Sequence, residues 1–270
     1  MEVGISTASF FNKCSIEDAV LDLGAHGVTL CELFLNSFSE YEPEFVDMLA
    51  GRVKRAGLKV FSVHPMSTQF EPLLFSLHPR QRGDSWKLFE QVLSDARTLG
   101  ASHYVLHGAA NLSGAAKNLQ LERLVPIFTD MIALAKSYGV TLTLENVSWC
   151  LFRTPEFGAR LLDALGSDSI HFTLDIKQAI RAGYSPLQFI DAVGDAIVNL
   201  HLCDAVQSSD GAYALKMPGK GDVDFAAVRD ALNAHGYAGP AFIEVYSDMY
   251  RDIGEIYASR DCMQRVFNRR

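Results

Sequence analysis

The sequence lacks the features that mark several protein classes. Its five cysteines are scattered, and no two stand in the CxxC spacing of zinc or redox sites. No uncharged apolar run reaches the roughly 18 residues of a membrane span, and the first residues, MEVGISTASFF, lack the basic region of a signal peptide. We therefore expect a cytoplasmic protein with reduced thiols and no membrane partner.

Positive charge is also in short supply. Lys and Arg number 24 against 32 for Asp and Glu, which gives a net charge of -8. Proteins that bind nucleic acid usually present a basic surface, so we expect no nucleic-acid partner. Glycine, at 20, and proline, at 9, are too few for a low-complexity or collagen-like chain, and hydrophobic residues, at 49%, suffice for a large core.

Short apolar and β-branched runs alternate with helix-like segments along the whole chain, which is typical of parallel βαβ units. The runs are Val3 to Ser6, Val28 to Phe34, Lys59 to His64, Tyr104 to His107, Thr141 to Glu145, Ile170 to Asp175, Ile197 to His201 and Ala241 to Val245. Their mean spacing of about 34 residues suits one βαβ unit each. Most of the helix-like segments end in glycine, which favours a left-handed C-terminal cap before the next strand.

This pattern predicts a single α/β domain over residues 1–270, a closed (β/α)8 TIM barrel. An open doubly wound sheet is the structural alternative. The chain has no GxGxxG or Walker loop after a strand, which argues against that alternative.

In a TIM barrel the active site lies at the C-terminal ends of the strands. The polar residues at or beside the predicted ends are Ser6, Glu32, His64, His107, Glu145, Asp175, His201 and Glu244. Alternation along a strand places Thr143 with Glu145, and Thr173 with Asp175, on one face. The upper inner face of the barrel is therefore expected to be polar.

Four of these side chains form a candidate metal site. Carboxylates gathered in one ring repel each other unless a cation compensates them. The four follow adjacent strands and supply three oxygen ligands and one imidazole, a set that suits Mn²⁺, Mg²⁺, Co²⁺ or Zn²⁺. We predict one such ion, held by Glu145, Asp175, His201 and Glu244. The alternative is that each of the four side chains is buried for a structural reason of its own, with its own hydrogen-bond partners, which requires four separate explanations for costly buried charge.

At these positions the sequence resembles the xylose isomerase-like superfamily of sugar isomerases and epimerases. The matching segments at the strands are LCELF, FSVHP, YVLHG, TLEN, FTLD, NLHLCD and FIEV. PGKGDVDF, which comes after the seventh strand, also resembles the family segment G-x-G-x-[IV]-[DN]-[FW]. The resemblance runs from the first strand to the last. It implies one divalent ion on the same four residues, and Glu145 and Glu244 flanking the substrate as proton carriers, as in ketose 3-epimerases and inosose isomerases.

The expected chemistry is proton transfer next to a carbonyl group. A metal ion that binds a carbonyl and its neighbouring hydroxyl acidifies the α C–H, and a carboxylate on either face can remove or return the proton. We expect an isomerase or epimerase of a small polyhydroxy carbonyl compound, such as a sugar, sugar phosphate or inosose, acting through an enediolate. A lyase or dehydratase, which expels a β-hydroxyl from the same intermediate, is the first alternative, and a non-catalytic sugar-binding barrel is the second.

Two positions depart from the family. The epimerases carry a substrate-binding His three residues after the Asp ligand, where this chain has Gln178, and an Arg six residues after the His ligand, where it has Gln207. In the related type IV endonucleases, which need three zinc ions, the equivalent of Gln178 is a zinc ligand. A phosphodiesterase of that kind is therefore the last alternative.

Further substrate contacts are expected from side chains around the barrel mouth. His64 and His107 are predicted to bind substrate hydroxyls, or else to cap their loops. Lys216 could pair with a phosphate or carboxylate, and Trp149 could form an apolar wall for a sugar face. Lys177 points either into the mouth or to solvent. The resemblance is compatible with a homo-oligomer.

Overall fold

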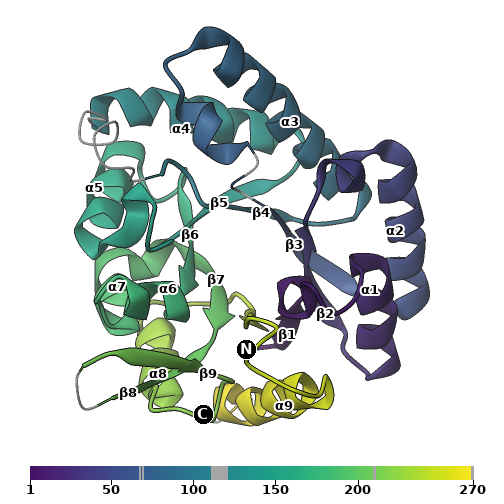
Figure 1. The fold of residues 1–270 in the computed structure, drawn as a ribbon. Helices are drawn as coiled ribbons and strands as arrows, with labels where there is room; N and C mark the ends of the chain where they lie inside the picture. The colour runs from purple at the N-terminus through teal and green to yellow at the C-terminus, as the bar shows by residue number, and fades with distance from the viewer. Residues whose placement is uncertain (67, 69, 111–120, 209–210, 269–270) are drawn as a thin grey trace.

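The computed structural model describes residues 1–66, 68, 70–110, 121–208 and 211–268. Eight parallel strands close into a barrel in the order β1-β10-β7-β6-β5-β4-β3-β2 (Figure 1). They are β1 (Val3–Ser6), β2 (Leu30–Leu35), β3 (Lys59–Pro65), β4 (His103–Leu106), β5 (Thr141–Glu145), β6 (His171–Asp175), β7 (Ile197–Leu202) and β10 (Ala241–Ile243). The predicted TIM barrel is confirmed.

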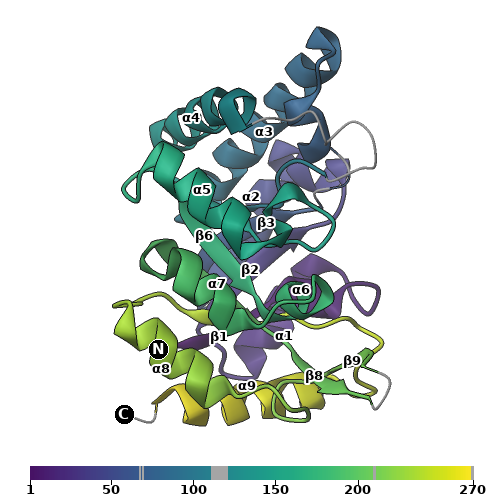
Figure 2. The ribbon, with the colours of Figure 1, turned by 90° about the vertical axis from the view of Figure 1, so that its left-hand side faces the viewer.

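Helices surround the barrel, and Figure 2 shows them stacked along its side. They are α1 (Ile16–Ala25), α2 (Pro43–Ala56), α3 (Pro79–Thr98), α4 (Leu121–Ser137), α5 (Pro155–Leu165), α6 (Ile176–Arg181), α7 (Pro186–Val193), α8 (Phe225–Ala234) and α9 (Gly254–Asn268). Across the part of the chain that the structure describes, no helix combines the length and apolarity needed to cross a membrane.

Local sequence explains why these helices form and where they stop. In α1, Ser15 caps the first turn by accepting a hydrogen bond from the Asp18 amide, and the buried residues recur at the helical spacing of three and four. At the end of α2, Gly57 adopts φ 70°, a left-handed conformation that glycine adopts without steric strain. The chain turns there and enters β3 two residues later.

Several strand boundaries differ from the predicted ones, and each difference has a hydrogen-bonding reason. Val28 was predicted to begin a strand, but its amide donates to Leu23 O at the end of α1, and β2 begins at Leu30. His107 was predicted to end a strand, but its amide donates to a carboxylate oxygen of Glu71, so β4 ends at Leu106. The last barrel strand stops at Ile243, one residue before Glu244.

Two elements beside the site were not predicted. Helix α6 starts directly after β6, because the Asp175 carboxylate caps it by accepting from the Gln178 amide. Strands β8 (Asp204–Gln207) and β9 (Tyr213–Lys216) form an antiparallel hairpin after β7. The six residues of α6 determine where Lys177 lies in the site.

Candidate metal centre and active-site cavity

The structure brings the four predicted metal ligands together at the upper end of the barrel. Glu145 and Asp175 end β5 and β6, His201 lies in β7, and Glu244 follows β10. None is more than 7% exposed, and their ligand atoms all lie within 4.8 Å of one another. His201 Nδ1 lies 2.9 Å from a Glu244 oxygen, 3.6 Å from an Asp175 oxygen and 3.7 Å from a Glu145 oxygen.

The hydrogen bonding of these atoms fits a divalent cation. Within the described residues, His201 Nδ1, Glu145 Oε2 and Glu244 Oε2 are buried and have no hydrogen-bond partner. Buried polar atoms without hydrogen bonds are costly. His201 Nδ1 and Glu244 Oε2 face each other at 2.9 Å, and Glu145 Oε2 faces His107 Nε2 at 2.8 Å. Three carboxylates and one imidazole are the donor set of a hard or borderline divalent ion. The residues present therefore fit the predicted metal.

Glu32 orients His201 from behind. One Glu32 oxygen lies 3.1 Å from His201 Nε2 and accepts hydrogen bonds from Ser62 Oγ at 2.7 Å and Asn199 Nδ2 at 3.2 Å. Burial alone would raise the pKa of Glu32, but His201 and His64 beside it hold that pKa at about 2. Burial would lower the pKa of His201, but Glu244 and Glu32 raise it well above its ordinary value. With Nε2–H facing Glu32, Nδ1 is the nitrogen that would bind an ion once its proton is released.

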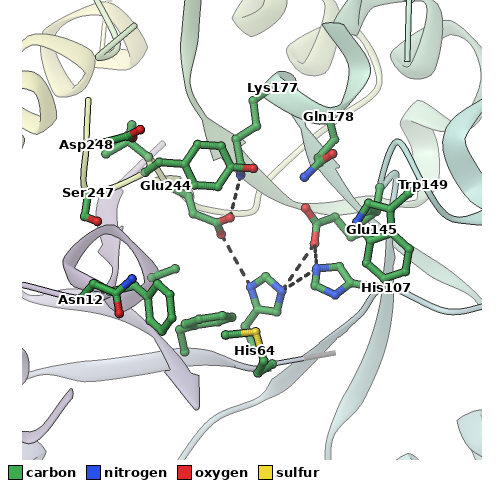
Figure 3. Close-up of a pocket in the computed structure, with 17 residues that line it drawn as sticks. Asn12, His64, His107, Glu145, Trp149, Lys177, Gln178, Glu244, Ser247 and Asp248 are labelled. Carbon is green, nitrogen blue, oxygen red and sulfur yellow. Dashed lines mark hydrogen bonds and ion pairs between the residues drawn. The ribbon is translucent and has the colours of Figure 1, made fainter. Parts of the chain in front are cut away.

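Lys177 points into the site, which settles the orientation that the sequence left open (Figure 3). Its ammonium group contacts Asp175 Oδ2 and lies 2.7 Å from Glu244 Oε1, with the Tyr246 ring centroid 5.8 Å away. Burial would lower the pKa of Lys177, but Asp175, Glu244 and Glu145 outweigh it and raise that pKa well above its ordinary value. The lysine is thus a fixed positive charge beside the metal ligands.

His64 and His107 form the opposite side of the site. Their Nε2 atoms lie 2.9 Å apart, and His107 Nε2 lies 2.8 Å from Glu145 Oε2. His64 Nδ1 lies 3.6 Å from a Glu244 oxygen. Burial would lower the pKa of His64, but the Glu244 and Glu32 carboxylates raise it to about 10. His64 thus lies near both Glu145 and Glu244, and His107 lies near Glu145.

A cavity of about 540 Å³ opens above this cluster (Figure 3). Its polar lining includes His64, His107, Glu145, Lys177, Gln178 and Glu244, with Asn12, Ser247 and Asp248 at its sides. Its apolar lining includes Phe11, Phe34, Met66, Val147, Trp149, Val245 and Tyr246. Apolar walls around a few convergent polar groups are typical of small-molecule sites.

Among the predicted site residues, Asp175 and His201 lie beneath the cavity lining, and Lys216 lies away from the cavity altogether. Lys216 is exposed at the end of β9 and borders a neighbouring depression that also includes Arg181, Tyr246 and Asp248. Gln207 is also exposed, at the end of β8. The predicted contact between Lys216 and substrate stays a prediction.

Three residues that support the site were not singled out from the sequence. Glu71, fully buried, accepts hydrogen bonds from Tyr104 OH at 3.0 Å and from the His107 amide at 2.9 Å. Asn146 accepts from the Asp175 amide at 2.6 Å. Asn199 had a signal, because it shares a strand face with His201, whereas Glu71 lies in a 3-10 turn whose sequence has no diagnostic period.

Residues 18–265 match the family described as the xylose isomerase-like TIM barrel. The match covers most of the chain, so the protein belongs to this family. It is a xylose isomerase-like barrel with a buried cluster of glutamate and histidine side chains that resembles a metal site.

Individual relatives are distant. An uncharacterized protein of Mycobacterium leprae is 26% identical over 282 residues, which covers 94% of this chain and 92% of that protein. The IOLI protein, solved with a zinc atom bound, superposes with a TM-score of 0.82 at 18% identity, covering 99% of this chain and 98% of that one. A D-tagatose 3-epimerase-like protein gives a TM-score of 0.81 at 19% identity, with 98% and 97% covered. These structural likenesses establish the fold.

Proposed function

We propose that the protein is a metal-dependent isomerase or epimerase of a small polyhydroxy carbonyl compound. One observation carries the proposal: Glu145, at the end of β5, and Glu244, just after β10, both lie beside His201 at the base of one cavity. The similarity to a zinc-containing IOLI structure and to a D-tagatose 3-epimerase-like protein supports it.

The four side chains that would hold the ion are Glu145, Asp175, His201 and Glu244. When bound, a divalent ion would polarise the substrate carbonyl and lower the pKa of the adjacent C–H. A glutamate on one side removes that proton, and the enediolate receives it back on the other carbon or on the other face. In this assignment Glu145 and Glu244 exchange protons with the substrate, whereas Asp175 and His201 hold the ion.

Other cavity residues would bind and orient the substrate. His64 presents ring nitrogens to Glu145 and Glu244, His107 presents one to Glu145, and both rings are suited to substrate hydroxyl groups. Trp149, 38% exposed at the cavity wall, offers an aromatic face to a sugar ring. Lys216, in the adjoining depression with Arg181, would contact an anionic substituent that extends out of the cavity.

Metal content is the first test. Elemental analysis of the purified protein should give about one divalent ion per chain, lost in His201→Ala. His235→Ala is the matched control, because His235 pairs with Asp195 at the surface and should leave the metal content unchanged. Absence of metal after addition of Mn²⁺ or Zn²⁺ would refute the proposal, and about three zinc ions would favour the nuclease alternative.

Proton transfer is the second test. The metal-loaded protein is incubated in D₂O with ketoses, inososes and hydroxy-keto acids, and deuterium in the recovered compound is measured by mass spectrometry. Glu244→Gln should abolish exchange and leave the fold intact, whereas Glu90→Gln, at an exposed position, should not change it. Full exchange in Glu244→Gln would contradict the assigned roles, and a product lighter by one water would identify a dehydratase.

A further inference from the structure

Lys177 occupies a position that metal-site chemistry alone does not require. It lies on α6, two residues after Asp175, and its side chain is 3% exposed. Its ammonium group bridges Asp175 Oδ2 and Glu244 Oε1, two of the four candidate metal ligands. A cation is thus built into the side of the site that would receive a second cation.

Asp175 and Glu244 differ in how many of their oxygens are already occupied by hydrogen-bond donors. Asp175 Oδ1 accepts from the Gln178 amide at 2.8 Å, so Oδ2 is the oxygen left to face His201, and Lys177 already contacts it. In Glu244, Oε1 accepts a hydrogen bond from Lys177 and Oε2 faces His201. An ion at this site would therefore share the Asp175 oxygen with the lysine.

The charge of Lys177 affects how tightly the site can bind a divalent ion. Glu145, Asp175 and Glu244 bring three carboxylates into a buried space, and Lys177, together with the neighbouring His64 and His201, offsets their charge in the absence of metal. A divalent ion placed beside the ammonium group meets like-charge repulsion and a reduced negative potential. The lysine thus stabilises the metal-free site and weakens its affinity for the ion.

We propose that Lys177 is an internal counter-ion that keeps the metal-free site ordered and makes the divalent ion exchangeable. This inference rests on the metal site proposed above. Its distinguishing feature is the sign of the effect: removal of a merely structural lysine would weaken metal binding, whereas removal of a competing cation strengthens it.

The test compares metal affinity in the wild type, Lys177→Met and Lys177→Arg by competition with a chromophoric chelator for Zn²⁺ and Mn²⁺. Lys177→Met removes the charge and keeps most of the apolar side chain, and it should bind either ion at least about tenfold more tightly. Lys177→Arg retains the charge and should show no such gain. Lys87→Met is the charge-matched control, because Lys87 is exposed and pairs with Asp84 at the surface.

Thermal unfolding provides a second readout that does not depend on activity. Without metal, Lys177→Met should unfold at a lower temperature than the wild type, since it leaves carboxylates without their counter-charge. Saturating metal should then raise its Tm by more than it raises that of the wild type, as tighter binding to the folded state requires. A variant that folds only in the presence of metal would meet the same expectation.

The outcomes separate this inference from the proposed function. If the wild type binds an ion and Lys177→Met binds it equally or more weakly, the counter-ion role is refuted and the metal site stands. If neither protein binds an ion, the proposed function fails. If Lys177→Met and Lys177→Gln fail to fold with and without metal, Lys177 is a structural residue and the inference is overturned.

Discussion

Glu32→Gln offers a sharp test of how the site prepares His201 for a metal ion. Glu32 is completely buried, and one of its oxygens meets three groups: Ser62 Oγ, Asn199 Nδ2 and His201 Nε2. A glutamine has nearly the same shape, and its carbonyl oxygen can still accept these hydrogen bonds. The substitution therefore removes the negative charge behind the imidazole and keeps the packing.

The expected loss follows from the role of that charge. A carboxylate facing Nε2–H favours the tautomer in which Nδ1 has its lone pair free, and it makes the ring a better ligand. The glutamine amide can instead donate to Nε2, which moves the ring proton to Nδ1 and blocks the ligand position. Loss of such a supporting group costs about 10- to 100-fold in metal affinity, or about 1.4 to 2.7 kcal/mol.

The assay is competition with a chelator, together with ¹⁵N NMR of the His201 ring nitrogens in the metal-free protein. Glu122→Gln, an exposed substitution with the same charge change, is the control and should bind metal normally. An unchanged affinity in folded Glu32→Gln would refute the orienting role of Glu32. An equal loss in Glu122→Gln would show that net charge, and not the contact with His201, controls the affinity.

Other predictions concern stability. Asp95 accepts one hydrogen bond from Gln91, and burial raises its pKa from 3.8 to about 7. Between these two pH values the folded state holds a proton that the unfolded state releases, so the free energy of unfolding falls as the pH rises. Urea unfolding should show Asp95→Asn more stable than wild type at pH 8, by at most about 4 kcal/mol, and no more stable below pH 4. Gly24→Ala places a Cβ 2.5 Å from Ala56 O, where α1 meets α2, and should lower the free energy of unfolding by about 1 to 3 kcal/mol. Gly51→Ala, a helical position with open space around it, should instead stabilise by about 0.5 to 1 kcal/mol; equal effects of the two would contradict the steric argument.

The strands and most site residues were predictable because barrel geometry imposes a simple rule. Parallel strands are buried on both faces and read as short apolar runs, and their C-terminal ends meet at one edge. Glu145 and Asp175 could therefore be placed together from sequence, and the structure puts them at neighbouring strand ends. His201 follows from the same reasoning on β7.

What the sequence did not reveal depends on short-range capping and on tertiary contacts. Helix α6 has six residues, too few for a helical period, and starts because Asp175 caps it. That cap decides which way Lys177 points, a fact that no hydrophobic pattern contains. Glu71 likewise reaches Tyr104 and His107 from a 3-10 turn more than 30 residues away in sequence, and such a contact leaves no local signal.

A comparison of the hydrogen bonds made by the buried carboxylates distinguishes those that support the barrel from those available for chemistry. Both oxygens of Glu71 accept hydrogen bonds, from a tyrosine hydroxyl and a backbone amide, and both oxygens of Asp175 have donors as well. Glu145 and Glu244 instead each turn one buried oxygen toward a histidine ring nitrogen, at 2.8 Å from His107 and 2.9 Å from His201. One oxygen of Glu32 contacts Ser62, Asn199 and His201, so Glu32 orients these side chains. Glu145 and Glu244 alone among these five also line the cavity, which is why proton transfer is assigned to them.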